Sequence, residues 1–319
     1  MADVVSIGEM LIDFVPDTAG TGLADVVHFS KVAGGAPANV AVGVVRQGGE
    51  AGFLGKVGDD PFGRFLGKVL SDAGVDTGGL LFTKQAQTGL AFVSLSSDGD
   101  REFLFYRSPS ADMLMAPEDV SDERLSAAKI LHFGTVAMIA EPSRSAILHA
   151  VSRARALGLT VSCDPNLREA LWPDLDTARQ VIGQALTLAD VIKISDYEAS
   201  FLTGDDDPVA AMRRIWQPNW RLVAVTCGPD GCTALTADDT VTVPGYPVEA
   251  VDTTGAGDAF TATMLTGLAR TPDVTKDRAA LTALLKRANA AGAIISTRRG
   301  AIASMPTADD IDGFLAARS

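Results

Sequence analysis

The most informative part of the sequence is residues 252–258, Asp-Thr-Thr-Gly-Ala-Gly-Asp, which run directly into the apolar, helix-like stretch Ala259–Ala269. The two glycines in this turn bring several backbone N–H groups to the start of the helix, where they and the positive end of the helix dipole attract an anion. The turn ends in a carboxylate, Asp258, which by itself repels one. This combination is useful where the carboxylate accepts a proton from a hydroxyl that attacks phosphorus. The alternative is that Asp252 or Asp258 only caps the helix.

Short apolar runs recur along the chain, and helical patterns separate most of them. Buried parallel strands have this composition, so the alternation predicts an α/β fold with a doubly wound, mostly parallel sheet flanked by helices. The expected strands are Val4–Gly8, Ala51–Val57, Lys129–Phe133, Leu159–Cys163, Val191–Ile194 and Leu222–Thr226. From N-cap, proline and glycine signals, helices are expected at Ala36–Arg46, from Asp60 to near Gly74, and at Pro142–Ala156, Ser195–Leu202, Lys276–Ile295 and Ala308–Ala317.

Two stretches, at about residues 12–32 and 89–107, interrupt the alternation of strand and helix patterns. The first has no helical period, and the second has two strand patterns joined by Ser97-Asp98-Gly99-Asp100, which is a hairpin signal. We expect a single domain over residues 1–319, with the two insertions forming a small β-sheet lid that excludes water from the site. An ordinary edge hairpin is the alternative.

Composition limits the partners of the chain. Its 319 residues are 47% hydrophobic and carry a formal net charge of −13, which argues against nucleic acid and anionic membranes as partners. A few local N–H groups and cations would still suffice for a small anionic substrate. There is no signal-peptide pattern, no long uninterrupted apolar run, and an odd number of cysteines, so we expect a soluble cytoplasmic protein without a disulfide framework.

Polar residues follow several of the predicted strands, at the end of an α/β sheet where ligands bind. Asp13 comes soon after the first strand and could accept hydrogen bonds from vicinal hydroxyls. Gly34-Gly35-Ala36-Pro37-Ala38-Asn39 allows a ligand to approach the backbone closely, and Asn39 suits a sugar hydroxyl. Asp164-Pro165-Asn166-Leu167-Arg168 ends in an arginine that could bind a phosphoryl or anionic group, or form a salt bridge with Asp164.

Two further segments have both a functional and a structural interpretation. Glu198 near a helix start could hold a hydrated Mg²⁺, or form a capping box with Ser195, and both could hold together. The glycines of Thr226-Cys227-Gly228-Pro229-Asp230-Gly231 could admit nucleotide phosphates or simply form a β-turn. The chain has no P-loop sequence and no dinucleotide-binding glycine fingerprint after its first strand.

With these segments in place, the chain resembles the ribokinase-like (PfkB) family of carbohydrate kinases over essentially its whole length. The strongest marker is the segment 252–258, and a second is Gly34–Asn39. Residues 55–63, Gly-Lys-Val-Gly-Asp-Asp-Pro-Phe-Gly, and the segment Thr226–Gly231 are also similar to family segments. Within the family, residues 105–112 and 164–168 most resemble fructokinases.

The resemblance implies an ATP-dependent sugar kinase with Asp258 as the catalytic base and Gly255, Ala256 and Gly257 as the anion hole. It assigns the sugar to Asp13, Gly34, Gly35, Asn39, Phe105, Arg107, Asn166 and Arg168. It assigns the nucleotide to Lys193, Ser195, Thr226, Gly228, Gly231 and Asn289, the last near the adenine. It assigns Mg²⁺ to Glu198 through water, and a monovalent cation such as K⁺ to Asp252, Thr254, Ile295, Arg298, Gly300 and Ser304.

One departure from the family pattern concerns the magnesium-associated motif Asn-x-x-Glu, because this chain has serine at position 195. The expected reaction is transfer of the γ-phosphoryl group of ATP to D-fructose, giving fructose 6-phosphate. 2-Keto-3-deoxygluconate, ribose or a nucleoside is the alternative substrate, and a non-catalytic sugar sensor is a remote one. The sequence leaves monomer and homodimer both open, with Phe92, Phe103 and Phe105 as candidates for a contact face on the lid.

Overall fold

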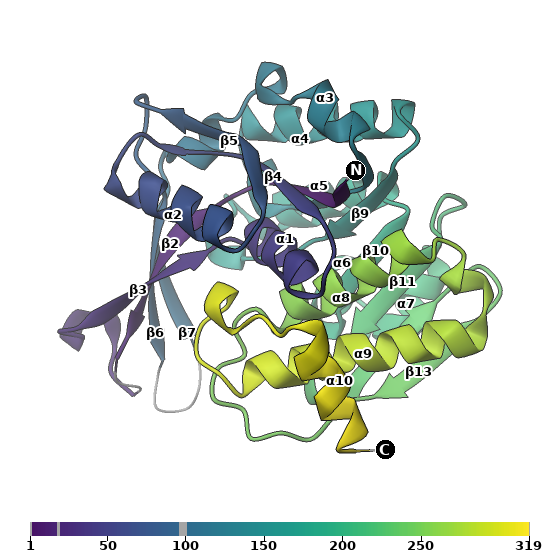
Figure 1. Cartoon of the computed structure of the whole chain (residues 1–319). Helices are drawn as coiled ribbons and strands as arrows, with labels where there is room; N and C mark the ends of the chain where they lie inside the picture. Colours follow the sequence, from purple (N-terminus) through teal and green to yellow (C-terminus); the bar gives the residue numbers. More distant parts are fainter. Residues whose placement is uncertain (1, 18–19, 96–100, 319) are drawn as a thin grey trace.

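The computed structural model describes residues 2–17, 20–95 and 101–318 and contains two sheets of unequal size (Figure 1). The larger sheet consists of β1 (Ala2–Ile7), β4 (Ala51–Gly58), β5 (Asp76–Thr83), β8 (Ala128–Gly134), β9 (Thr160–Asp164), β10 (Val191–Ser195), β11 (Leu222–Thr226), β12 (Gly231–Leu235) and β13 (Thr240–Pro244). Within the described ranges its order is β13-β12-β11-β10-β9-β8-β1-β4-β5. Every pair is parallel except the two that β12 makes, so the predicted doubly wound sheet is confirmed.

The predicted helices are present, with ends that differ by only a few residues. Asp60 caps α2 by accepting hydrogen bonds from the N–H groups of Phe62 and Gly63, with Pro61 at the first position. The helix after the 252–258 turn begins three residues earlier than expected, at Ala256. The helices are α1 (Ala36–Arg46), α2 (Pro61–Asp72), α3 (Asp122–Ser126), α4 (Ser143–Ala156), α5 (Leu175–Thr187), α6 (Asp196–Thr203), α7 (Pro208–Arg214), α8 (Ala256–Arg270), α9 (Arg278–Ser296) and α10 (Ala308–Ala316).

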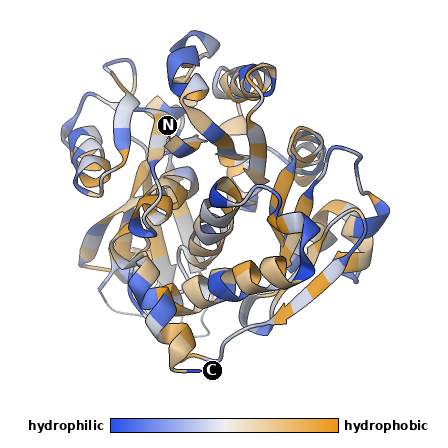
Figure 2. Cartoon of the chain, turned by 45° about the vertical axis from the view of Figure 1, so that its right-hand side comes forward, coloured by the Kyte–Doolittle hydropathy of each residue, from blue (hydrophilic) through white to orange (hydrophobic). Residues whose placement is uncertain are grey.

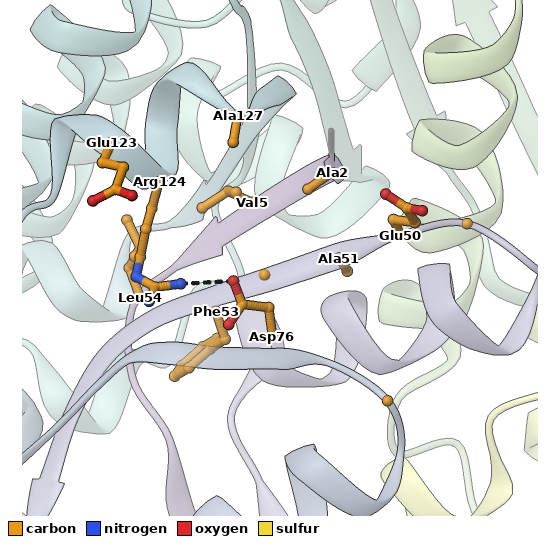
Figure 3. A pocket seen from close by; sticks show the side chains of 13 residues that line it. Ala2, Val5, Glu50, Ala51, Phe53, Leu54, Asp76, Glu123, Arg124 and Ala127 are labelled. Atoms are coloured by element: carbon orange, nitrogen blue, oxygen red, sulfur yellow. Dashed lines mark hydrogen bonds and ion pairs between the residues drawn. The ribbon is translucent and has the colours of Figure 1, made fainter.

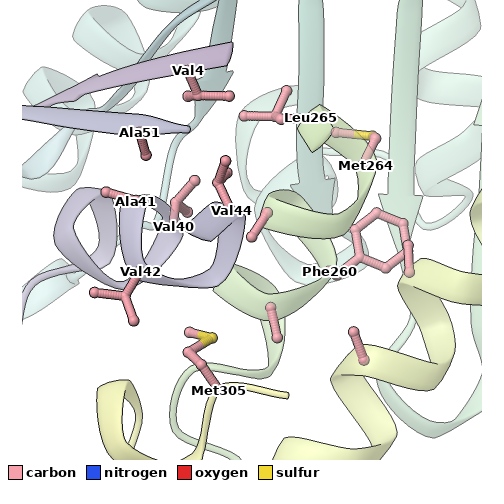
Figure 4. Packing of buried hydrophobic residues seen from close by; sticks show 14 of the residues in the cluster. Val4, Val40, Ala41, Val42, Val44, Ala51, Phe260, Met264, Leu265 and Met305 are labelled. Carbon is pink, nitrogen blue, oxygen red and sulfur yellow. The ribbon is translucent and has the colours of Figure 1, made fainter. Parts of the chain in front are cut away.

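Successive residues of the central strands pack into two different cores, one on each face of the large sheet. Val4 belongs to the core that α1, α8 and α9 cover, where Val40, Phe260 and Leu265 pack with it (Figure 4). Its neighbour Val5 belongs to the opposite core, formed with α4 and α5. Hydrophobic colour accordingly dominates the central strands, and hydrophilic residues gather on the outer helices and loops (Figure 2). No helix in the described ranges is both long and apolar enough to cross a bilayer.

The smaller sheet is formed by the two insertions that the sequence indicated. It contains β2 (Leu11–Pro16), β3 (Phe29–Gly34), β6 (Leu90–Leu95) and β7 (Arg101–Tyr106), in the order β3-β2-β6-β7. The β2–β3 and β6–β7 pairs are antiparallel, and a parallel β2–β6 pair joins the two insertions into one sheet. The expected turn at Ser97–Asp100 lies outside the described residues. Because β2 follows β1 almost directly, this sheet stands at the carboxyl edge of the larger one (Figure 1).

Candidate active site

A polar cleft of about 320 Å³ lies where the carboxyl ends of β1, β9 and β10 meet the small sheet and the start of α8. Alternate residues of the small sheet face it, since Leu11, Asp13 and Val15 line the cleft from β2. Many of the expected site residues contribute to its wall, which is lined by Asp13, Gly35, Asn39, Phe105, Asn166, Arg168, Lys193, Ser195, Glu198, Asp252, Thr254, Gly255, Gly257 and Asp258, among others.

A second cleft, of about 600 Å³, adjoins the first and has a different character. Thr226, Gly228, Gly231 and Asn289 line this apolar cleft, together with Ala256. The side-chain amide of Asn289 donates to the carbonyl oxygens of Val243 and Pro244, both at 3.1 Å, and so ties α9 to the end of β13. Both clefts include Thr253 and Gly257, so occupants of the two clefts would meet at the amino end of α8.

The 252–258 turn delivers the start of α8 to this junction. Gly255 has a left-handed backbone, with φ +83°, and a Cβ at this position would lie 3.0 Å from that of Ala301, so glycine is required. The N–H of Ala256 donates to the Thr253 carbonyl oxygen at 3.2 Å and closes the turn. The helix dipole and the N–H groups of the first turn of α8 therefore point at the junction of the two clefts.

Asp258 lies in this first turn and faces the polar cleft. One of its oxygens accepts a hydrogen bond of 2.7 Å from the side-chain amide of Asn39 on α1. Burial raises the pKa of Asp258 above its ordinary value, although the Asn39 hydrogen bond and the charges of Lys193 and Arg168 oppose the rise. A carboxylate with a raised pKa beside an anion-binding helix end suits a general base.

A network of buried charges supports this base. Lys193 on β10 lies 3.2 Å from the carboxylate of Asp164 at the end of β9, and Thr261 donates to the same carboxylate at 3.3 Å. Burial raises the pKa of Asp164 to about 6 against the opposing charge of Lys193. Burial would lower the pKa of Lys193, but the charges of Asp164, Glu198 and Asp258 raise it overall, so the ammonium stays charged. Arg168 makes no salt bridge with Asp164 and donates instead to its neighbour's carbonyl oxygen, that of Leu167.

Glu198 is held rigidly at the edge of the polar cleft. Its two oxygens accept hydrogen bonds from the N–H of Leu167 at 2.7 Å and from the N–H and hydroxyl of Ser195, both at 2.8 Å. The capping box that the sequence predicts is therefore confirmed. Serine at position 195 performs this capping itself by accepting from the Glu198 N–H at 3.2 Å.

Two buried acceptor atoms of the polar cleft have no hydrogen-bond partner within the described part of the chain. They are Oε2 of Glu9 and Oδ1 of Asn39. The other Glu9 oxygen accepts from the N–H of Ala36 at 3.3 Å, at the first residue of α1. Leaving a buried acceptor unpaired is unfavourable, so these atoms indicate where hydroxyl groups of a ligand would donate.

The residues expected around a monovalent cation come together behind the turn. Asp252 accepts from the N–H and hydroxyl of Thr254, at 2.9 and 2.6 Å, and from the N–H of Gly300 at 3.0 Å. The Ser304 hydroxyl donates to the carbonyl oxygen of Arg299 at 2.6 Å, and the Ile295 side chain packs near Gly255. Arg298 directs its guanidinium toward Asp310, at 3.5 Å, so only its backbone carbonyl is available to a cation.

Two residues expected at the sugar do not line the polar cleft. Gly34 lies behind Asp13, and a Cβ at this position would be 2.0 Å from the Asp13 carboxylate, so the glycine makes room for that side chain. Arg107 is buried in an ion pair with Asp112 and is not among the residues that line the cleft, so its expected contact with the sugar stays a prediction. The Arg107–Asp112 pair could not be predicted from hydrophobic periodicity, because Asp112 lies in a 3₁₀ turn that is too short to show a periodic pattern.

Sequence reasoning also missed parts of both clefts. Glu9 faces the polar cleft, and residues of the loop 245–250, including Tyr246 and Val248, line the apolar one. Glu9 lies just beyond the carboxyl end of β1, which is the signal that could have found it, as it did for the segment at Asp164. The loop carries no comparable signal.

A further cavity, of about 460 Å³, lies at the opposite edge of the large sheet, where β1, β4 and β5 begin (Figure 3). Its principal polar feature is the ion pair of Arg124 with Asp76, at 2.6 Å. It holds none of the residues that the sequence assigned to a ligand. The chemical groups are therefore concentrated at the carboxyl edge.

Comparison with known proteins agrees with this arrangement. The family model described as "pfkB family carbohydrate kinase" matches residues 1–308, so the chain belongs to this family and is a phosphotransferase with an alcohol group as acceptor. The chain is 49% identical to fructokinase-1 of Oryza sativa subsp. japonica over 95% of its own length and 94% of the relative's. It is 48% identical to fructokinase-1 of Zea mays, with 97% and 96% covered.

Solved structures give the same answer. A fructokinase from Xylella fastidiosa with bound ATP superimposes with a TM-score of 0.91 at 35% identity, covering 100% of this chain and 99% of the other. A fructokinase from Vibrio cholerae O395, in a fructose-, ADP- and calcium-bound form, superimposes with a TM-score of 0.88 at 36% identity, covering 98% and 99%. A double mutant of the Vibrio cholerae enzyme was solved with fructose, ADP and a potassium ion, with a TM-score of 0.87.

Proposed function

We propose that this chain is a fructokinase that transfers the γ-phosphoryl group of ATP to the 6-hydroxyl of D-fructose. The observation that carries the proposal is the position of Asp258, which is partly buried, hydrogen-bonded to Asn39 and placed in the first turn of α8 where the two clefts meet. Its relatives and structural neighbours include named fructokinases, among them enzymes solved with ATP or with fructose and ADP.

In this mechanism the sugar occupies the polar cleft and the nucleotide the apolar cleft. Asp258 takes the hydroxyl proton as the sugar oxygen attacks the γ-phosphorus. The backbone at Gly255–Gly257 and the dipole of α8 stabilise the charge on the transferring group. The small sheet covers the sugar and limits water access, which reduces ATP hydrolysis.

The sugar hydroxyls have matching groups along the cleft wall. Asp13 lies on β2 and Asn166 follows β9, and both face the cleft. The unpaired acceptor atoms of Glu9 and Asn39 add two positions where a hydroxyl would donate. A site built to pair with hydroxyls discriminates strongly against substrates that lack them.

Mg²⁺ fits this site as an ion held largely by the nucleotide. Within the described residues there is no cluster of three His, Cys, Asp or Glu side chains that would form a protein cage. Glu198 is fixed by three hydrogen bonds and faces the polar cleft, which suits an outer carboxylate that binds a hydrated ion through water. The ion would neutralise phosphate charge, and Glu198 would orient its water shell.

A monovalent cation fits behind the anion hole. The carboxylate of Asp252 links the 252–258 turn to the segment around Gly300, and K⁺ held by carbonyl oxygens of the two segments would stiffen the turn. The potassium-bound Vibrio cholerae variant supports this assignment. Turnover should therefore rise when K⁺ replaces a large organic cation in the buffer.

The outer face of the lid is our proposed contact surface for a second copy of the chain. Leu104 and Tyr106 are 48% and 59% exposed there. Phe92 stacks on Phe14 and contacts the ring of Tyr106, so it belongs to this face, whereas Phe105 lines the polar cleft. Only the backbone is described at Phe103. Sedimentation of the wild type and of Leu104→Lys tests this surface, and identical monomeric profiles for the two would contradict it.

The experiment that tests the activity is a panel of sugars with coupled detection of ADP, with and without K⁺. We expect the largest kcat/KM with D-fructose, and phosphorus NMR should identify the product as the 6-phosphate. A large preference for 2-keto-3-deoxygluconate, ribose or a nucleoside would reject fructose as the substrate.

A further inference from the structure

Arg107, which directly follows the lid strand β7, is neutralised inside the protein. Its side chain is 3% exposed, and that of its partner Asp112 is 1% exposed. The Arg107 Nε donates to one Asp112 oxygen at 3.1 Å, and an Nη of the same guanidinium donates to that oxygen as well. The other Asp112 oxygen accepts from the Ser110 hydroxyl. The positive charge of the Arg107 guanidinium is therefore balanced by the Asp112 carboxylate.

Glu9 brings a carboxylate to the wall of the polar cleft, close enough to Arg107 and Asp112 to feel their charges. It lines the cleft, is only 3% exposed, and has one oxygen without a partner among the described residues. Burial raises the pKa of Glu9 to about 7, while the charge of Arg107 opposes the rise. With Glu9 ionised, Glu9, Arg107 and Asp112 sum to one negative charge. With Glu9 protonated they sum to zero, so this part of the wall is never positive.

The position of Glu9 identifies the part of a substrate that it faces. Asp258 meets α1 through Asn39, whereas Glu9 meets it through the N–H of Ala36, about one turn away. Glu9 therefore faces substrate atoms remote from the hydroxyl that Asp258 activates. Lys193 and Arg168, which also line the cleft, are close enough to Asp258 to lower its pKa, so these cations serve the phosphoryl end.

We propose that the Glu9–Arg107–Asp112 cluster is a charge filter that makes the enzyme select a neutral ketohexose over sugar acids. In 2-keto-3-deoxygluconate the carboxylate is at the opposite end of the carbon chain from the 6-hydroxyl, so it would meet this wall. An anion there finds like charge or no charge in a desolvated site, which is unfavourable. An arginine released from Asp112 would instead offer it a bidentate partner. The inference rests on the proposed sugar-kinase function, with the reacting hydroxyl at Asp258.

The test is the variant Asp112→Asn, which keeps the shape of the side chain and removes its charge. We measure kcat/KM for D-fructose and for 2-keto-3-deoxygluconate and form their ratio. The ratio of acid to fructose should rise at least about tenfold over wild type, because the guanidinium is no longer neutralised. The matched control is Asp122→Asn, which removes a carboxylate from the exposed ion pair with Arg153 and should leave the ratio unchanged.

A second variant distinguishes two explanations of such a rise: release of the Arg107 charge, or added space in the cleft. Arg107→Met combined with Asp112→Leu removes both charges and retains apolar volume, so the ratio should stay near the wild-type value. Binding of gluconate, followed by calorimetry, provides a readout if Asp112→Asn turns over slowly, and it should tighten in that variant alone.

Three outcomes would overturn the filter or the function beneath it. A folded Asp112→Asn protein with wild-type ratio and wild-type gluconate binding rejects the filter and leaves the fructokinase proposal standing. An equal rise in the double variant rejects it too, because the gain would then come from space and not from charge. A wild-type enzyme that prefers the acid to fructose rejects the proposed function itself.

Discussion

The two clefts meet at Thr253 and Gly257, yet different types of residue line them. The polar cleft contains the buried ionisable groups of Asp164 and Lys193 and the partly buried carboxylate of Asp258. The apolar cleft is lined by glycine, proline and aromatic residues and by the tethering amide of Asn289. A sugar presents hydroxyls that must be paired one by one, whereas an adenine ring is recognised largely by a flat apolar slot. From this difference we expect the polar cleft to discriminate between sugars and to hold the reacting groups. We expect the apolar cleft to recognise its ligand mainly by shape.

The largest effect should come from the polar cleft, at Asp258. Asp258→Asn keeps the size of the side chain and removes the proton acceptor, so kcat should fall by about 10²–10⁴-fold while fructose still binds. Coupled ADP detection gives the rate, and calorimetry gives the binding. The exposed Asp206→Asn is the matched control and should retain wild-type turnover. Wild-type kcat in Asp258→Asn would contradict the assignment of the base.

In the apolar cleft the backbone is the sensitive element, at Gly231. Its φ is +100°, and an added Cβ would lie 2.3 Å from the Val243 carbonyl oxygen. Gly231→Ala should therefore lower the free energy of unfolding by about 1–3 kcal/mol in urea titrations. Gly183→Ala is the control, because it lies in α5 with open space around it and should instead raise stability by about 0.5–1 kcal/mol. Equal effects of the two changes would show that backbone strain is not what requires glycine at 231.

A smaller effect is expected at Asn289, which supports the apolar cleft without touching the reacting atoms. Asn289→Ala removes two hydrogen bonds to β13 and should raise the KM for ATP by about 2–10-fold, with the KM for fructose unchanged. The control is Asn219→Ala, which removes comparable bonds to the carbonyl oxygens of Thr187 and Ala189 away from both clefts. A parallel rise in the fructose KM would mean that the clefts are not functionally separate.

The smallest effect is a shift of the pH profile. Asp258 acts as a base only when ionised, so kcat should fall as the pH drops through its raised pKa. The Asn39 hydrogen bond lowers that pKa, so Asn39→Ala should raise it further and move the acidic limb to higher pH. Glu9→Gln should leave the acidic limb in place, which distinguishes the titration of Asp258 from that of Glu9. A limb that stays in place or moves to lower pH in Asn39→Ala would contradict this account.

Much of the fold followed from signals that span only a few residues. The apolar runs predicted six strands of the large sheet and missed β5, β12 and β13. The Asp60-Pro61 pair predicted the start of α2, and the Ser195–Glu198 capping box predicted that of α6. The 252–258 segment likewise predicted a helix start with Asp258 in its vicinity. Such patterns succeed because caps, turns and strand alternation are determined by nearby residues.

The sequence by itself thus determined the elements, the glycine turn and the residue types that stand at the strand ends. Only the tertiary structure decided which of them meet. It brings Asn39 to Asp258 across 219 residues, pairs β2 with β6 in parallel, places the loop 245–250 along the apolar cleft, and buries Arg107 against Asp112. The physical reason is that charge pairing and cleft lining depend on distances through space, which the order of strands in the sheet sets and local patterns do not contain.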